Sequence, residues 1–183
     1  LYSELITDEI WAEQRKNYGY KNVSPNRLMI NLAGLPYIDV RTDFNSFLPS
    51  GLPAKLEKKI INYYITQIKK NPSNHDKIEF NLVETCYDLN TKKNLKKFLN
   101  SKETKVYSEK LKIITNKILE KKNKLLNIEE KKVRSLEKKI DKIQSSKISE
   151  IQKIFYLVND CKKYGTLPFA GIARAAFIYT KIL

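Results

Sequence analysis

The residues best suited to chemistry lie in one short segment that is centred on an arginine. Asp39, Arg41 and Asp43 are spaced two apart, and Asn45 and Ser46 follow directly. In a strand this spacing places side chains on one face, so a guanidinium would stand between two carboxylates. A planar guanidinium binds a carboxylate or a phosphate through two parallel hydrogen bonds. We therefore predict that Arg41 holds an anionic ligand; the alternative is an exposed strand face with surface ion pairs.

Two short strands are expected to position this segment. Residues 28–32 and 37–41 flank a turn at 33–36, which is typical of a β-hairpin. A third strand is predicted over 78–87, because apolar and polar residues alternate there. The three strands would form a small antiparallel sheet with helices on one face.

The rest of the chain is predicted to be mainly helical, because apolar residues recur there at spacings of three and four. The helices expected from this pattern cover 1–18, 54–70, 90–98, 102–126 and 129–164, and a last helix follows a break at 164–168.

The two longest of these helices are rich in lysine and contain almost no glycine or proline. Their apolar phase changes near Asn127, and Glu130 follows three residues later in a pattern like a capping box. We expect these two helices to fold back on each other as an antiparallel hairpin. In the last helix, the predicted packing stripe consists of mostly small residues, and Arg174 lies off it. The stripe comprises Phe169, Ile172, Ala173, Ala176 and Thr180.

These elements predict an α+β fold with a helical majority. We divide the chain into an α+β core at 1–101 with the candidate site, a helical hairpin at 102–163, and a C-terminal helix at 164–183 that packs back on the core.

The basic charge of the chain is unevenly distributed. Of its 183 residues, 35 are Lys or Arg and 20 are Asp or Glu, for a net charge of +15. Residues 1–90 carry eleven of each sign, so all of the excess lies in 91–183. The lysines are scattered around the predicted helices with few arginines, which favours a solvated helical face over a nucleic-acid interface. A basic helical interaction module is kept as an alternative.

Several classes of site are not predicted. His75, the single histidine, lies in a turn without a nucleophile at a telling spacing. There is no glycine-rich phosphate loop and no cluster with metal-ligand spacing. Cys86 and Cys161 are far apart, which favours a reducing compartment. With no apolar run of about 20 residues to span a bilayer, a cytoplasmic location is expected.

Four segments together resemble the middle region of the phosphoenolpyruvate (PEP)-utilising enzymes that are similar to PEP synthase. They are LYSELITDEIWAEQRKNYGY, YIDVRTDFNSFLP, NHDKIEFNLVETCYDL and KKYGTLPFAGIARAAF. The likeness covers most of the chain except the lysine-rich helices. It is strongest to the branch that includes the L-glutamine kinase of capsular phosphoramidate biosynthesis.

The resemblance implies that the chain is one part of a longer kinase. Such enzymes have an ATP-grasp region, a central region and a swivelling phosphohistidine domain, and this chain would be the central, acceptor-binding part. ATP with Mg would phosphorylate the histidine outside this segment, and the phosphohistidine would pass its phosphoryl group to the acceptor. The acceptor would be the amide nitrogen of L-glutamine; the alternative is a PEP synthase-like enzyme that acts on pyruvate or another small acid.

An amino-acid acceptor would suit the predicted residues. Its carboxylate would bind Arg41, its ammonium would bind Asp39 or Asp43, and its amide would bind Asn45 or Ser46. Arg174 is a second candidate for a carboxylate or a phosphate. We expect no catalytic residue, metal or cofactor in this segment itself, and its partners would be the acceptor and the other two domains.

Overall fold

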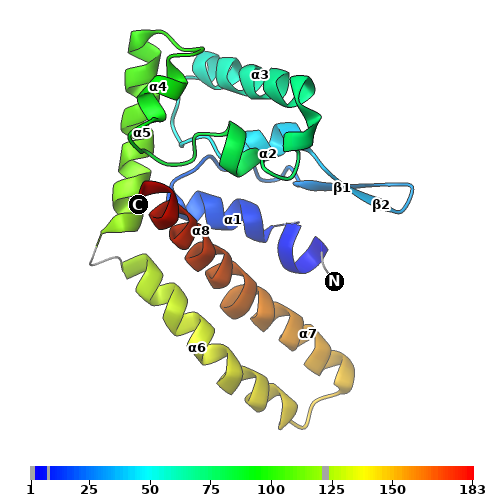
Figure 1. Cartoon of the computed structure of the whole chain (residues 1–183). Helices are drawn as coiled ribbons and strands as arrows, with labels where there is room; N and C mark the ends of the chain where they lie inside the picture. Colours follow the sequence, from blue (N-terminus) through cyan, green and yellow to red (C-terminus); the bar gives the residue numbers. More distant parts are fainter. Residues whose placement is uncertain (1–2, 8, 121–123) are drawn as a thin grey trace.

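The computed structural model describes residues 3–7, 9–120 and 124–183 (Figure 1). The chain is mostly helical with one small antiparallel sheet, as predicted. The α-helices and strands are α1 Ile10–Tyr18, β1 Met29–Leu32, β2 Leu35–Ile38, α2 Val40–Ser46, α3 Ala54–Lys70, α4 Thr91–Leu95, α5 Ser101–Leu119, α6 Lys124–Gln144, α7 Glu150–Asp160 and α8 Leu167–Ile182. Short 3-10 or π-helical turns cover Ser3–Thr7, Pro72–Asn74, Ile78–Leu82 and Cys161–Thr166.

The β-hairpin turns on two residues. Ala33 and Gly34 have φ angles of 51° and 83°, the left-handed pair that a tight two-residue hairpin turn requires. The register pairs Leu32 with Leu35 and Met29 with Ile38, and Figure 1 shows the hairpin projecting from the body. The first predicted strand is thus confirmed.

The second predicted strand is confirmed as the antiparallel partner of the first, but it covers Leu35–Ile38 instead of 37–41, and the third predicted strand is wrong. The second strand ends at Ile38, because the Asp39 side chain accepts hydrogen bonds from the backbone N–H groups of Arg41 and Thr42 and thereby starts α2. Residues 78–82 form a single π-helical turn closed by the bond from the Val83 N–H to the Ile78 carbonyl. The alternating pattern there therefore does not produce a third strand.

Two apolar clusters hold the body together. The first joins α2, α3, the turn at 78–82 and the first half of α5 around Phe44, Tyr64 and Tyr107. The second joins α1, the second half of α5 and α8 around Tyr18 and Ile178. Because α5 contributes to both clusters, it is the element to which the rest of the body is fixed.

The long hairpin differs from the prediction. Helix α5 belongs to the body, and the predicted arm at 129–164 turns at 145–149 instead of continuing. After that turn, α7, the π-helical turn Cys161–Thr166 and α8 follow without an interruption, so the predicted break at 164–168 is also wrong. The observed hairpin consists of α6 against α7 and α8, and Figure 1 shows its far end extending away from the body.

A buried hydroxyl group adds a polar link between the hairpin and the body, beside the apolar packing of α8 on α1 and α5. The Tyr18 hydroxyl oxygen lies 2.8 Å from Glu129 Oε2 and 2.7 Å from the Gly171 carbonyl oxygen, so it links α1, α6 and α8. A Cβ atom at position 171 would overlap the Glu129 carboxylate. A larger residue at this crossing would therefore displace the Glu129 carboxylate.

Candidate ligand-binding site

Two adjoining cavities lie where α1, α2, α8 and the turn at 78–82 meet. Their volumes are about 550 Å³ and about 270 Å³, and both are lined by Trp11, Arg15, Glu79 and Phe80. We call these two cavities and their shared wall the arginine site. Arg174 lines the smaller cavity.

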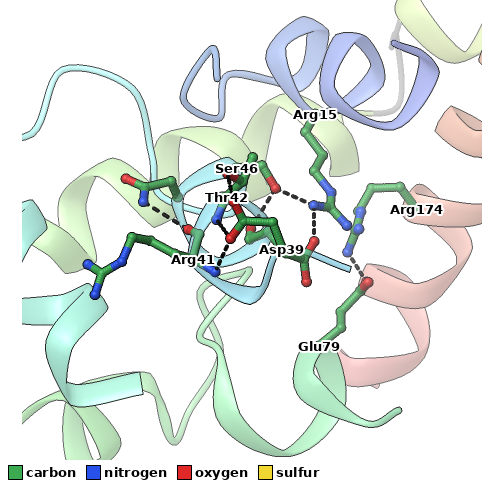
Figure 2. Close-up of polar contacts among 9 residues, drawn as sticks. Arg15, Asp39, Arg41, Thr42, Ser46, Glu79 and Arg174 are labelled. Carbon is green, nitrogen blue, oxygen red and sulfur yellow. Dashed lines mark hydrogen bonds and ion pairs between the residues drawn. The ribbon is translucent and has the colours of Figure 1, made fainter. Parts of the chain in front are cut away.

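Helix α1 positions Arg15 through its spacing from Trp11. The two residues are four apart, so they share a helix face, and the guanidinium carbon lies 5.7 Å from the Trp11 ring centroid. Arg15 is 6% exposed. Its Nη1 donates to Asp43 Oδ1 at 2.6 Å and to the Ser46 hydroxyl, both of which α2 supplies (Figure 2).

Helix α8 supplies a second buried guanidinium. Arg174 is 7% exposed and pairs with Glu79 from the turn at 78–82. Burial, together with nearby Arg15, lowers the pKa of Arg174 to about 10, although Tyr20 and Asp43 oppose the change. Arg174 therefore stays a cation at neutral pH.

Both guanidiniums lie close to one aromatic ring. The Phe47 ring centroid lies 3.7 Å from the Arg15 guanidinium carbon and 5.2 Å from that of Arg174. Three carboxylates, Asp43, Asp76 and Glu79, line the two cavities beside these two arginines, so the site presents charges of both signs. A site that presents both signs suits a ligand that itself carries both signs.

Two buried donors at this site lack acceptors. Arg174 Nε and Gln14 Nε2 are shielded from solvent and form no hydrogen bond within the described part of the chain. Both residues line the smaller cavity. Leaving a buried donor unpaired costs roughly 1–3 kcal/mol, and native structures seldom tolerate it. The wall of the cavity therefore favours a ligand with acceptor oxygens.

The structure brings three of the six predicted site residues together. Asp43 and Ser46 contact Arg15, and the Ser46 hydroxyl also donates to the Asp43 carbonyl at 2.6 Å. Arg174 reaches the same region from α8, and Figure 2 shows its guanidinium beside that of Arg15. Asp43 and Arg174 thus line the arginine site, whereas Ser46 is fully buried, lines neither cavity and holds Arg15 in place.

The other three predicted residues lie outside this site. Asp39 is occupied as the N-cap of α2, and the Asn45 amide donates to the Arg41 carbonyl at 2.9 Å. Arg41 is exposed on α2, and in Figure 2 its side chain extends away from Arg15 and Arg174. Since the chain is helical here, the predicted strand face with a guanidinium between two carboxylates does not exist. A ligand-binding role for these three residues stays a prediction.

Several residues of the site were not predicted. Arg15, Gln14 and Glu79 were assigned to ordinary helix or strand positions, and Trp11 was assigned to an apolar stripe. One available signal was an arginine four residues after a tryptophan and three before Tyr18, which places a cation on an otherwise apolar helix face.

Other chemistries have little support in the described residues. No group of three or more His, Cys, Asp or Glu there is placed to hold a metal ion. His75 lies on the wall of the larger cavity, but it is exposed and its Nδ1 lies 3.1 Å from the Pro72 carbonyl oxygen.

Comparison with known proteins adds no assignment: no family model, no curated protein and no solved structure matches the chain. Among the described helices, none combines the length and the apolar character needed to cross a membrane.

Proposed function

We propose that the chain binds a small zwitterionic acceptor, of the amino-acid type, in its arginine site. The observation that carries this proposal is the pair of unpaired donors, Gln14 Nε2 and Arg174 Nε, in the wall of a cavity. A carboxylate supplies acceptor oxygens for such donors. Asp43 and Glu79, which line the larger cavity, supply the opposite charge for an ammonium group.

The resemblance to PEP-utilising enzymes supports a wider role. In this proposal the chain is the acceptor-binding part of an ATP-dependent phosphotransferase, and L-glutamine is the preferred acceptor. The nucleotide, Mg and the phosphohistidine belong to other parts of the enzyme. Phosphoryl transfer depends on orientation and charge stabilisation, so a rigid acceptor site contributes without a catalytic side chain of its own.

A PEP synthase-like enzyme that acts on pyruvate is the second candidate. It shares the need for a carboxylate partner but not for an ammonium partner. Because Asp43 and Glu79 provide anionic groups beside the arginines, the site favours the amino acid over the keto acid. Pyruvate and L-glutamine therefore discriminate between the two candidates.

Isothermal titration of the 183-residue chain with L-glutamine, pyruvate and PEP tests the proposal. We expect binding of L-glutamine and weaker binding of the other two. Gln14→Met removes one unpaired donor at similar volume, and we expect about tenfold weaker binding, since a hydrogen bond to a charged group contributes about 1.5 kcal/mol or more.

The control is a variant outside the two cavities. Arg41→Ala removes an exposed arginine on α2 that lines neither cavity, and it should leave the affinity for L-glutamine unchanged. Equal weakening by both variants would show that the effect is not specific to the cavity and would oppose the site. Absence of binding by all three compounds would contradict the proposal.

A further inference from the structure

A second cavity, of about 410 Å³, lies between α4 and α5, apart from the arginine site. Four lysines line it: Lys92 and Lys96 from α4, or directly after it, and Lys105 and Lys112 from α5. We call it the lysine cavity. It shares no lining residue with the arginine site, so the two cavities differ in what they can bind.

The charges of the lysine cavity are not balanced. Glu109 is the single carboxylate on its wall, against four ammonium groups. None of the four lysines forms an ion pair with a described residue, and Lys112 lies over the Tyr87 ring, with its Nζ 5.5 Å from the ring centroid. Four converging like charges repel one another, so an anion inside the cavity would be favourable.

Hydroxyl groups of α5 also line the lysine cavity. One belongs to Ser101, the first residue of this 19-residue helix, whose N-terminus is already capped by Asn100 and the Glu103 carboxylate. Thr104, one turn later on the same wall, is 3% exposed, and its hydroxyl has no hydrogen-bond partner among the described residues. A hydroxyl can donate to a ligand oxygen after a rotation about one bond.

We propose that the lysine cavity binds a small molecule that carries at least two linked phosphate groups. A single carboxylate would neutralise one of the four lysines, whereas a diphosphate carries enough negative charge to match the excess. The lysines come from α4, or directly after it, and from α5, and all four line one hollow. That convergence favours a compact polyanion over a nucleic-acid backbone.

Titration calorimetry of the 183-residue chain with inorganic pyrophosphate, at constant ionic strength, tests this proposal. The variant Lys96→Gln with Lys105→Gln removes two cations from the cavity. The variant Lys138→Gln with Lys142→Gln removes the same charge from the exposed face of α6 and is its matched control. We expect about tenfold or greater weakening in the first variant, from the loss of charge-assisted hydrogen bonds, and little change in the control.

A second variant tests the same proposal without changing the charge. Thr104→Val keeps the shape of the side chain and removes the hydroxyl, so we expect several-fold weaker binding of pyrophosphate with the fold retained by circular dichroism. Gln14→Met should leave pyrophosphate binding unchanged, which separates this proposal from that of the arginine site.

Three outcomes would overturn the assignment. One is equal weakening in the cavity and control double variants, which would show non-specific attraction. Another is sulfate at the same ionic strength binding as tightly as pyrophosphate. The third is binding of duplex DNA with the same dependence on Lys96 and Lys105, which would assign the surface to a nucleic acid.

Discussion

Arg15 is held on two sides by groups of different character. Asp43 and Ser46 accept its hydrogen bonds, and the Phe47 ring covers its face. Such a buried ion pair contributes little net stability, because removing both charges from water offsets their attraction. Removal of one partner alone is different, since it leaves an uncompensated charge in the interior.

Arg15→Met should therefore destabilise the chain by about 3–5 kcal/mol, because the Asp43 carboxylate loses its buried counter-ion. Urea denaturation followed by circular dichroism measures the change. Adding Asp43→Asn removes the orphaned charge and should recover a substantial part of the loss. A double variant that is no more stable than Arg15→Met would show that packing, rather than charge, sets the cost.

The buried carboxyl group of Glu129 is expected to make the stability of the chain depend on pH. Burial raises the pKa of this carboxyl, while the Tyr18 hydroxyl and nearby Lys132 oppose the shift. Burial likewise raises the pKa of Glu84, against Lys181 and Asn94. Each of these carboxyl groups has a higher pKa in the native state than in the unfolded state, so between those two values the native state binds more protons. The resulting stabilisation is complete below the unfolded-state pKa and is lost as the pH rises through the native-state pKa.

Glu129→Gln should reduce that loss, because the amide oxygen still accepts from Tyr18 but carries no charge. We expect the difference in free energy of unfolding between mildly acidic and neutral pH to become smaller. Urea titrations at both pH values measure it. Glu130→Gln, at an exposed neighbouring position, is the control and should leave the difference unchanged. A wild-type chain whose stability rises across this range would contradict the assignment.

At the scale of elements, α2 shows how one side chain selects a helix over a strand. The Asp39 carboxylate accepts from the N–H groups of Arg41 and Thr42 at 2.9 and 3.1 Å, and from the Thr42 hydroxyl at 2.8 Å. These bonds satisfy donors that have no partner within the helix. The alternation of charged residues in 39–43 therefore does not place them on one face of a strand.

Asp39→Ala should cost about 1 kcal/mol of stability through loss of this cap. Arg41→Ala, two residues later, should change stability by less than about 0.5 kcal/mol, because its side chain is exposed. Chemical denaturation of the two variants makes the comparison. Equal costs would mean that the ordering of α2 does not depend on the Asp39 carboxylate.

The sequence predicted those elements whose ends are marked by special residues. Helix α3 was predicted at 54–70 and occupies Ala54–Lys70, because Pro53 precedes it and Pro72 follows shortly after it. The end of α1 was also predicted, since Gly19 takes a φ of 106° at its C-cap. The turn at 78–82 was wrong, because five residues are too few to distinguish a strand period from a helical one.

The packing face of the last helix was predicted wrongly for a different reason. The predicted small-residue stripe is mostly exposed, with Phe169 66% exposed, whereas the buried face carries Gly171, Arg174 and Ile178. A buried arginine reverses the apolar phase on which such predictions depend. Likewise Asn127 lies inside α6, and the two capping boxes found at Asn100 and Ser149 were not predicted.

At the scale of the whole molecule, half of the candidate site was predictable and half was not. Asp43, Ser46 and Arg174 were named because their chemistry suits a zwitterion. Arg15 and Glu79 were not, since their proximity depends on how α1 and the turn at 78–82 pack against α8. Long-range packing of this kind leaves no local pattern in a single sequence.

The distribution of charge predicts a salt effect on the whole fold. All of the net charge of +15 lies in 91–183, and most lysines there have no ion-pair partner among the described residues. Added salt screens repulsion between exposed charges. Raising sodium chloride from 20 to 200 mM should increase the Tm by about 2–4 °C, which corresponds to roughly 1 kcal/mol for a chain of this size.

Calorimetry in the two buffers measures this increase. A variant with glutamine at Lys131, Lys138 and Lys142 of α6 carries less charge and should show a smaller increase. A Tm that falls with added salt would show that attractive ion pairs outweigh the repulsion.

The crossing at Gly171 has a mechanical consequence for the hairpin of α6 with α7 and α8. The hydrogen atom that stands in place of a Cβ leaves room for the Glu129 carboxylate beside the Tyr18 hydroxyl. A larger side chain would push that carboxylate away from the hydroxyl, and α6 would then lose its polar link to α1. The absence of a side chain at one residue of α8 thus preserves an attachment between two other helices.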